Sequence, residues 1–257
     1  MNTLTDSATM VRRSLRHLVR YPSLTLMLIA FPVVFLLLFV FVFGGTLGAG
    51  LGVGGGRAEY LEYVTPGILL IAVASAAQGT AITVAMDMVE GIVARFRTMA
   101  ITRASVLTGH VVGNVIQSMV CAVVVVGVAL LIGFRPSAGP LEWLGALGML
   151  ALVSLALTWL SVALGMVTTS VETASNLPMP LTFLPFLSSG FVPTASMPDG
   201  LRWFAEYQPF TSMIETLRGL LTGGPIDSAP IAVAWCLAIT LGGYLWARRL
   251  YDRDPSR

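Results

Sequence analysis

The sequence predicts an all-α polytopic membrane protein with six transmembrane helices. Of its 257 residues, 56% are hydrophobic and only 11% are charged, whereas soluble domains carry about 25% charged residues. Six stretches without any charged residue are each 20 residues or longer, which is the length that an α-helix needs to cross about 30 Å of hydrocarbon. Because backbone amides in lipid have no water to bond, such stretches must be helical.

We expect these spans to form a single membrane domain that covers residues 1–257. The spans lie near residues 23–44, 64–86, 105–133, 143–170, 174–194 and 228–247. The fifth stretch is the weakest, because it contains four prolines, each of which lacks a backbone donor. These are Pro178, Pro180, Pro185 and Pro193. Whether this span is continuous or kinked is left open by the sequence.

The arginines are distributed unequally between the two sides that six spans define. All 15 basic residues are Arg; 11 of them fall on the side of the two termini and the 87–103 loop, and 4 on the other side. Because Arg-rich loops stay in the cytoplasm, both termini are predicted to be cytoplasmic. A re-entrant fifth stretch would reduce the bias to 9 against 6, so the six-span topology is favoured.

Two segments outside the spans carry most of the inner arginines. Residues 6–20 predict an amphipathic helix that lies in the headgroup plane and faces anionic lipid. Its arginines are Arg12, Arg13, Arg16 and Arg20. The alternative is a basic flank that only directs insertion. Residues 87–103 mix charged and apolar side chains, which fits either a helix seated in a protein groove or a loop without a partner.

Residues 199–227 are predicted to form two short interfacial helices on the outer side. The first carries aromatic residues typical of a membrane-interface belt, namely Trp203, Phe204 and Tyr207. The second begins near Pro209 and ends before Gly223, since proline favours the first helical position and glycine follows the last. Glu215 and Arg218 are spaced to pair on its surface.

The composition excludes several classes of function. A chain without Lys has no P-loop lysine or Schiff-base lysine, and spans without ionisable residues argue against a membrane enzyme or a proton-coupled carrier. Cys121 and Cys236 have no metal or disulfide spacing, and a net charge of +2 does not suggest nucleic acid. Uncharged polar residues in the spans are expected to bond across helices or to line a path. Three such candidates are Gln78, Asn114 and Gln117.

The run from Phe186 to Leu221 carries the most specific motif. It contains an F-x-P element, M-P, P-x-T and a closing L-R; the matching residues are Phe191, Pro193, Met197, Pro198, Pro209, Thr211, Leu217 and Arg218. Together with the basic N-terminal segment and the stretch that begins Glu90-Gly91, this run resembles the membrane subunit of type-2 ABC exporters of the daunorubicin/doxorubicin-resistance kind. Gln208 stands where these permeases commonly have Asn, and Ala100 where they often have Pro.

This resemblance implies a pair of permeases in the bacterial plasma membrane, either two copies or two related chains, each seated on a cytoplasmic ABC ATPase. Residues 87–103 would be the coupling helix, with the contact residues Glu90, Gly91, Arg95, Phe96 and Arg97, and residues 6–20 the connecting helix. ATP and magnesium would bind the ATPase, so this chain is expected to hold no cofactor and to be no enzyme itself. The implied cargo is a hydrophobic or amphipathic drug, lipid or glycolipid. The alternative is a non-transporting membrane assembly or scaffold factor.

Overall fold

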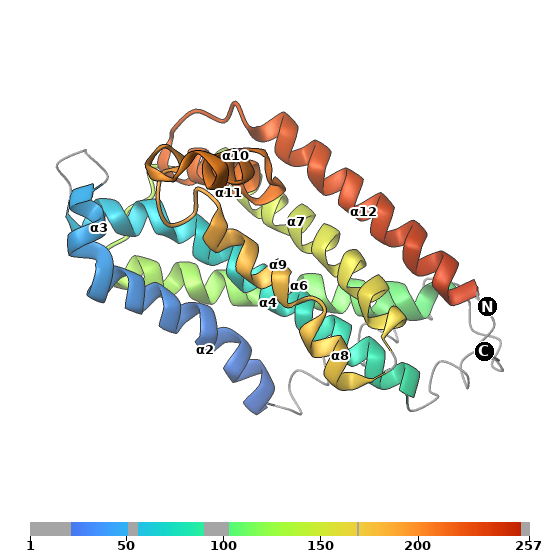
Figure 1. Ribbon diagram of the computed structural model, residues 1–257. Coiled ribbons are helices and arrows are strands. Elements are labelled where there is room, and N and C mark those ends of the chain that lie inside the picture. The colour runs from blue at the N-terminus through green and yellow to red at the C-terminus, as the bar shows by residue number, and fades with distance from the viewer. Residues whose placement is uncertain (1–21, 51–55, 90–102, 169, 253–257) are drawn as a thin grey trace.

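The computed structural model describes residues 22–50, 56–89, 103–168 and 170–252, and these ranges contain helices and no strand. Long helices run beside one another; α10 and α11 lie together near one end of the bundle, whereas α8 and α9 lie along it (Figure 1). The long elements are α2 (Pro22–Leu38), which continues through the π-helical η1 (Phe39–Phe43) into α3 (Gly44–Gly50), and α4 (Arg57–Val89), α6 (Arg103–Leu131), α7 (Pro140–Val167) and α12 (Ala229–Asp252). The short elements are α8 (Val171–Asn176), α9 (Met179–Phe183), η2 (Leu184–Leu187), η3 (Thr194–Ser196), α10 (Asp199–Tyr207) and α11 (Pro209–Thr222).

Five helical stretches within the described ranges are long and apolar enough to cross a membrane. They are Leu26–Ala49, Arg57–Val89, Thr108–Leu131, Pro140–Val167 and Ala229–Tyr251. These stretches correspond to the first, second, third, fourth and sixth predicted spans. The all-α polytopic class is therefore confirmed, and both Cys121 and Cys236 are free and buried, as their apolar surroundings predict.

The fifth predicted span, residues 174–194, does not form one helix. It is divided among α8, α9 and the 3₁₀ helix η2, followed by turns. Pro178 precedes α9, Pro180 is its second residue, and Pro185 lies in η2. Each of these prolines removes an amide that a continuous helix would use. The stretch is therefore interrupted, and η3 begins only at Thr194.

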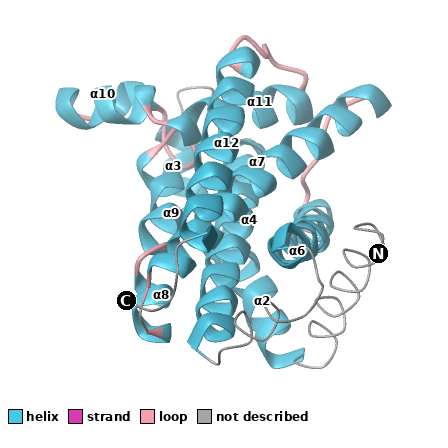
Figure 2. Ribbon diagram, turned by 90° about the vertical axis from the view of Figure 1, so that its right-hand side faces the viewer, coloured by secondary structure: helices cyan, strands magenta, loops and turns pink. Residues whose placement is uncertain are grey.

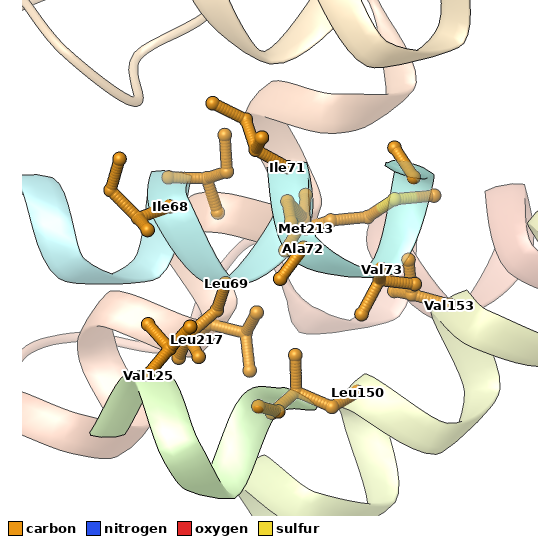
Figure 3. Packing of buried hydrophobic residues seen from close by; sticks show 14 of the residues in the cluster. Ile68, Leu69, Ile71, Ala72, Val73, Val125, Leu150, Val153, Met213 and Leu217 are labelled. Carbon is orange, nitrogen blue, oxygen red and sulfur yellow. The ribbon is translucent and has the colours of Figure 1, made fainter. Parts of the chain in front are cut away.

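Helix α4 is the centre of the bundle. Every residue from Val64 to Ala74 is buried, because α2, α6, α7 and α11 pack around it. Figure 3 shows Ile68 to Val73 of α4 among side chains from three other helices, including Leu150 and Met213. Since lipid tails are as apolar as these side chains, close van der Waals packing rather than exclusion of water holds such helices together.

Small residues provide the close approaches that this packing needs. A Cβ atom on Gly165 of α7 would lie 2.5 Å from the carbonyl oxygen of Ala81 in α4. A Cβ atom on Gly243 of α12 would lie 2.8 Å from the backbone of Trp159 in α7. Only glycine allows these backbones to approach so closely, and so α4, α7 and α12 form one tightly packed layer.

Contacts along the helices fix their directions. Leu28 of α2 lies beside Gly79 of α4, whereas Phe41 of η1 lies beneath the guanidinium of Arg57, so α2 and α4 are antiparallel. Contacts of the same kind place the C-terminal end of α4 beside the N-terminal end of α6. They also place it at the same end of the bundle as the C-terminal ends of α7 and α12. We call this the Val89 end; it also holds Arg103, Val167 and Asp252. The opposite end, where α4 begins, is the Arg57 end.

The two helices predicted to be interfacial differ in the structure. Helix α10 projects from the bundle (Figure 2), and its aromatic side chains Trp203 and Tyr207 are exposed. Helix α11 begins at Pro209 and stops at Gly223, whose φ of 70° is left-handed, so its predicted boundaries are confirmed. Whether it lies at the membrane interface stays a prediction, but it is not a helix on the surface of the bundle. Most of α11 is buried, because Met213 and Leu217 reach the middle of α4 (Figure 3).

Candidate functional site: an interrupted segment fastened to α4

Residues 171–193, which we call the interrupted segment, run antiparallel to α4 for most of its length. Ser175 lies at the level of Gln78, and Phe191 lies at the level of Tyr60. Eighteen residues of α-helix rise about 27 Å. The interrupted segment therefore extends over a distance close to the thickness of a hydrocarbon core, about 30 Å, although it is not a continuous helix.

Local hydrogen bonds satisfy part of the irregular backbone of this segment. Ser170 caps α8 by accepting a bond from the amide of Thr173, and the hydroxyl of Ser188 joins two backbone groups. It donates to the carbonyl of Pro185 at 2.5 Å and accepts from the amide of Gly190 at 3.2 Å. Non-helical backbone at membrane depth is tolerated only where the protein itself supplies such partners.

Gln78 of α4 holds the first break of the segment, between α8 and α9. Its Nε2 donates to the carbonyl of Ser175 in α8 at 2.7 Å. Its Oε1 accepts a hydrogen bond from the hydroxyl of Thr182 in α9 at 3.0 Å. One side chain thus bridges both sides of the break that Pro178 and Pro180 produce.

Two glycines let the later part of the segment touch α4. A Cβ atom on Gly67 would lie 2.9 Å from the carbonyl oxygen of Gly190, so neither backbone could approach so closely with a larger residue there. About two turns before Gly67 in α4, the hydroxyl of Tyr60 donates to the carbonyl of Phe191 at 3.3 Å. The turn after η2 is therefore fixed directly on the α4 backbone.

Arg218 of α11 fastens the same turn from the other side. Its guanidinium donates to the carbonyl of Ser189 at 2.6 Å and to the carbonyl of Tyr63 at 3.2 Å. It also lies 3.9 Å above the centre of the Tyr63 ring, a cation–π contact. Three residues beyond Tyr63, Pro66 interrupts the amide ladder of α4. Arg218 therefore binds backbone carbonyls next to two irregularities, one in α4 and one in the interrupted segment.

The surroundings of Arg218 explain how a charge is kept there. Burial lowers the pKa of Arg218 from its ordinary value, whereas the neighbouring Tyr63 and Glu215 raise it; an arginine remains charged across such shifts. The predicted surface pair with Glu215 is not what the structure shows. The carboxylate of Glu215 instead accepts from the hydroxyl of Ser228 at 2.8 Å, because Arg218 points into the protein.

Gln208, at the junction of α10 and α11, binds the end of η2. Its Nε2 donates to the carbonyl of Leu187 at 2.5 Å and, more weakly, to that of Leu184 at 3.4 Å. The side chain is 6% exposed. The resemblance described above predicts Asn at this position, and the longer amide of Gln208 reaches carbonyls 21 and 24 residues earlier in the chain.

Phenylalanine rings pack the interrupted segment against the first helix. Phe186 and Phe191 are stacked with their centres 4.6 Å apart, and Phe39 lies 4.5 Å from Phe191. Phe35 meets the edge of Phe186 at 5.5 Å. Aromatic pairs at such distances are favourable beyond their buried area. The π-helical turn η1 begins at Phe39, so the first helix changes its winding where it contacts the segment.

At the Val89 end, Asp87 and His110 join α4 to α6. The Nε2 of His110 lies 3.1 Å from a carboxylate oxygen of Asp87, and Asp87 is 6% exposed. The sequence placed Asp87 in a loop, but α4 continues to Val89. This pair stands at the point where α4 ends and α6 begins, on either side of residues 90–102.

The predicted site residues are only partly among those described. Gln78 bridges α4 to the interrupted segment, and Asn114 of α6 donates to the hydroxyl of Thr158 in α7 at 2.6 Å. Gln117 is half-buried, and its side chain has no hydrogen bond within the described ranges. Whether any of the three lines a path stays a prediction. The other predicted residues lie outside the described ranges; these are Arg12, Arg13, Arg16, Arg20, Glu90, Gly91, Arg95, Phe96 and Arg97.

The fold and these contacts define a polytopic helical membrane protein whose interrupted segment is held by hydrogen bonds to the neighbouring helices. Residues 6–222 match the family model of the ABC-2 type transporter. The chain therefore belongs to the ABC-2 type transporter family, and its resemblance to permeases of the daunorubicin/doxorubicin-resistance kind is confirmed.

Individual relatives agree with this family. The chain is 29% identical over 228 residues to the daunorubicin resistance ABC transporter permease protein DrrB1 of Streptomyces coeruleorubidus, covering 84% of this chain and 77% of that protein. It is 27% identical over 175 residues to the probable doxorubicin resistance ABC transporter permease protein DrrC of Mycobacterium tuberculosis, covering 66% and 63%. It is 25% identical over 177 residues to ABC transporter G family member 20 of Dictyostelium discoideum, covering 66% of this chain and 23% of that protein.

Replacing Gln78 with leucine is expected to loosen the interrupted segment. The Gln78→Leu variant loses the bonds to Ser175 and Thr182, so the free energy of unfolding should fall by about 1–2 kcal/mol. Gln117→Leu is the matched control, because it removes the same amide from a half-buried position without a side-chain bond, and it should change stability by less than about 0.5 kcal/mol. Equilibrium unfolding in mixed micelles compares them; equal losses would contradict the role of Gln78.

Replacing Arg218 with lysine is expected to destabilise the protein although the charge is kept. A single ammonium group cannot stack on Tyr63 and bond both carbonyls as the planar guanidinium does, so Arg218→Lys should cost about 2 kcal/mol of unfolding free energy. Arg202→Lys is the control, since Arg202 forms an exposed pair with Glu206, which is worth little. The prediction fails if the two variants unfold at the same denaturant concentration.

Proposed function

We propose that this chain is the transmembrane permease subunit of an ATP-driven exporter that moves a hydrophobic or amphipathic compound out of the cell. The observation that carries the proposal is the family match over residues 6–222, on a chain whose described part is an apolar helical bundle. The names of two relatives, which refer to daunorubicin and doxorubicin resistance, support a drug, lipid or glycolipid as cargo. Export of such a compound would also confer resistance to it.

In this proposal the interrupted segment makes a fifth membrane crossing in pieces, between the crossings of α7 and α12. Its length beside α4, from Gln78 to Tyr60, supports this topology. Six crossings place Pro22 and Asp252 on the same side of the membrane. This agrees with the bundle, in which both residues lie at the Val89 end. The excess of Arg on that side supports a cytoplasmic orientation for it.

ATP hydrolysis belongs to a separate cytoplasmic ABC ATPase in this proposal, which would bind ATP and magnesium. The chain has no Lys for a phosphate-binding loop of its own. Within the predicted stretch 87–103, the part after Val89 would form the coupling helix, with Glu90, Arg95 and Arg97 among its contacts. The Asp87–His110 pair supports this placement, because it ties the end of α4 to the start of α6 beside that stretch.

Helix α4 would carry the motion of the ATPase from one side of the membrane to the other. A displacement of its Val89 end moves a buried helix whose contacts with the interrupted segment extend from Gln78 to Tyr60, near the Arg57 end. A second copy of the permease, or a related chain, would pack in the membrane beside the first and share the path. The paired bundles would then exchange between inward-open and outward-open states as the ATPase binds and hydrolyses ATP.

Substitutions in the coupling stretch should abolish transport without preventing membrane insertion. Glu90→Ala or Arg97→Ala is expected to reduce ATP-dependent accumulation of a lipophilic fluorescent compound, in inverted vesicles with the co-expressed ATPase, to the level of vesicles without permease. The reason is that the motor loses its contact with the bundle. Glu59→Ala is the matched control, because Glu59 is exposed at the opposite end of α4 and should leave accumulation unchanged.

Normal accumulation by both coupling variants would contradict the assignment of residues 87–103. If the wild-type complex neither accumulates the compound nor shows faster ATP hydrolysis when it is added, the exporter proposal itself fails. That result would favour a non-transporting membrane scaffold.

A further inference from the structure

Two polar stripes face each other where α6 packs on α7. Asn114 and Ser118 lie one turn apart on α6, and on α7 the residues Ser154, Thr158 and Ser161 follow at intervals of four and three, which places them on one face. The hydrogen bond from Asn114 to Thr158 fixes the register of this antiparallel pair. One turn towards the Arg57 end, Ser118 and Ser154 therefore lie at the same level.

Four polar atoms in this seam are buried and have no hydrogen-bond partner among the residues that the structure describes. They are Asn114 Oδ1, Ser118 Oγ, Ser154 Oγ and Ser161 Oγ. Asn114 is 4% exposed, and the three serines are 0% exposed. A buried polar group without a partner lowers stability, so four of them in one seam would cost a large fraction of the stability of most proteins.

Several threonine hydroxyls in the long helices behave differently. Thr65, Thr83 and Thr240 each donate to the carbonyl one turn earlier in the same helix, at 2.6–2.9 Å. Thr158 does the same, donating to the carbonyl of Ser154 at 2.6 Å. The serines of the seam do not use this local partner, so their hydroxyls remain available to a ligand that lies between the helices.

The seam continues to the Val89 end of the bundle as a polar column. His110, Asn114 and Ser118 are spaced four residues apart on α6, so they lie on one face. The side chain of His110 is 15% exposed and contacts Asp87. Ser118 lies ten residues beyond Thr108, where the apolar stretch of α6 begins, and is therefore about 15 Å further along the helix. These residues mark a polar line from the end of the bundle to the middle of the seam.

We propose that the seam between α6 and α7 is a binding site for internal water, which enters past His110 and ends between Ser118 and Ser154. Water is the ligand that fits, because it both donates and accepts. It can donate to Asn114 Oδ1, which is only an acceptor, and exchange hydrogen bonds with the serine hydroxyls. A water-bridged seam also lets α6 shift against α7 without leaving a polar group unbonded, since the waters rearrange with it.

Contact with water is tested directly by water-edited solid-state NMR on the full-length protein in lipid bilayers. Magnetisation should pass from water to the side-chain amide of Asn114 and to Ser118 and Ser154. It should not reach Val125, which is 0% exposed on the same helix in an apolar environment, at the same mixing time. Transfer to Asn114 that is as slow as transfer to Val125 would overturn the proposal.

A double-mutant cycle tests whether the two serines share that water. In a hydrated seam, Ser118→Ala and Ser154→Ala should each lower the folding equilibrium constant roughly fivefold. The double variant should lower the folding equilibrium constant by less than the product of the two single effects, because both substitutions remove the same water bridge. In a dry seam the sign reverses: each substitution removes an unbonded polar group and raises stability.

The control for this cycle is Ser212→Ala. Ser212 is 8% exposed, and its hydroxyl already donates to the carbonyl of Pro209 at 2.9 Å, so its effect should simply multiply with that of Ser154→Ala. A rise in stability for either seam variant, or independent effects of the two, would overturn the shared-water site. None of these measurements involves transport or ATP hydrolysis.

Discussion

A backbone carbonyl or amide in hydrocarbon has no solvent to bond, and this constraint is most severe where a chain at membrane depth is not a continuous helix. In the proposed topology the interrupted segment is such a place, since its prolines remove amides and its helix ends and turns leave carbonyls without an intrahelical partner. Three long side chains donate to those carbonyls. Gln78 reaches Ser175, Gln208 reaches Leu187, and Arg218 reaches Ser189.

These three donors come from different parts of the chain, which explains why the segment, α4 and α11 form one unit. Gln78 belongs to the central helix, Gln208 to the junction before α11, and Arg218 to α11 itself. Arg218 is bonded at once to the segment and to the α4 carbonyl of Tyr63. A movement of α4 therefore cannot leave the segment behind without breaking hydrogen bonds that have no replacement in an apolar environment. This is the physical basis for coupling the two ends of the bundle in the proposed exporter.

The sequence predicts the long helices well, because the thickness of a hydrocarbon core fixes the length of an apolar stretch. The ends of α11 were also predictable, since Pro209 and Gly223 act through local backbone geometry. The burial of α11 was not, because an amphipathic stretch fits either a membrane surface or a protein groove. Arg218 was assigned to a surface pair for the same reason: its true partners, Tyr63 and Ser189, lie 155 and 29 residues away.

The prolines of the fifth span indicated that it could be interrupted, but they did not indicate which side chains compensate for the interruption. A proline shows which amide is missing, whereas the side chain that bonds the freed carbonyl is chosen by tertiary packing. Gln78 and Asn114 illustrate this difference. Both are polar residues in apolar stretches, and the sequence singles out both, yet their partners, Ser175 and Thr158, follow only from how the helices are placed.

The central claim is that residues 171–193 pass from one side of the membrane to the other although they are not one helix. Single cysteines on either side of the segment test it, in a protein whose Cys121 and Cys236 are replaced by alanine. Glu172→Cys and Ser196→Cys place thiols at two exposed positions. In intact cells, a membrane-impermeant maleimide should label Ser196→Cys at once, and should label Glu172→Cys only after the membrane is permeabilised. Equal labelling of both positions in intact cells, or of neither, would contradict the account.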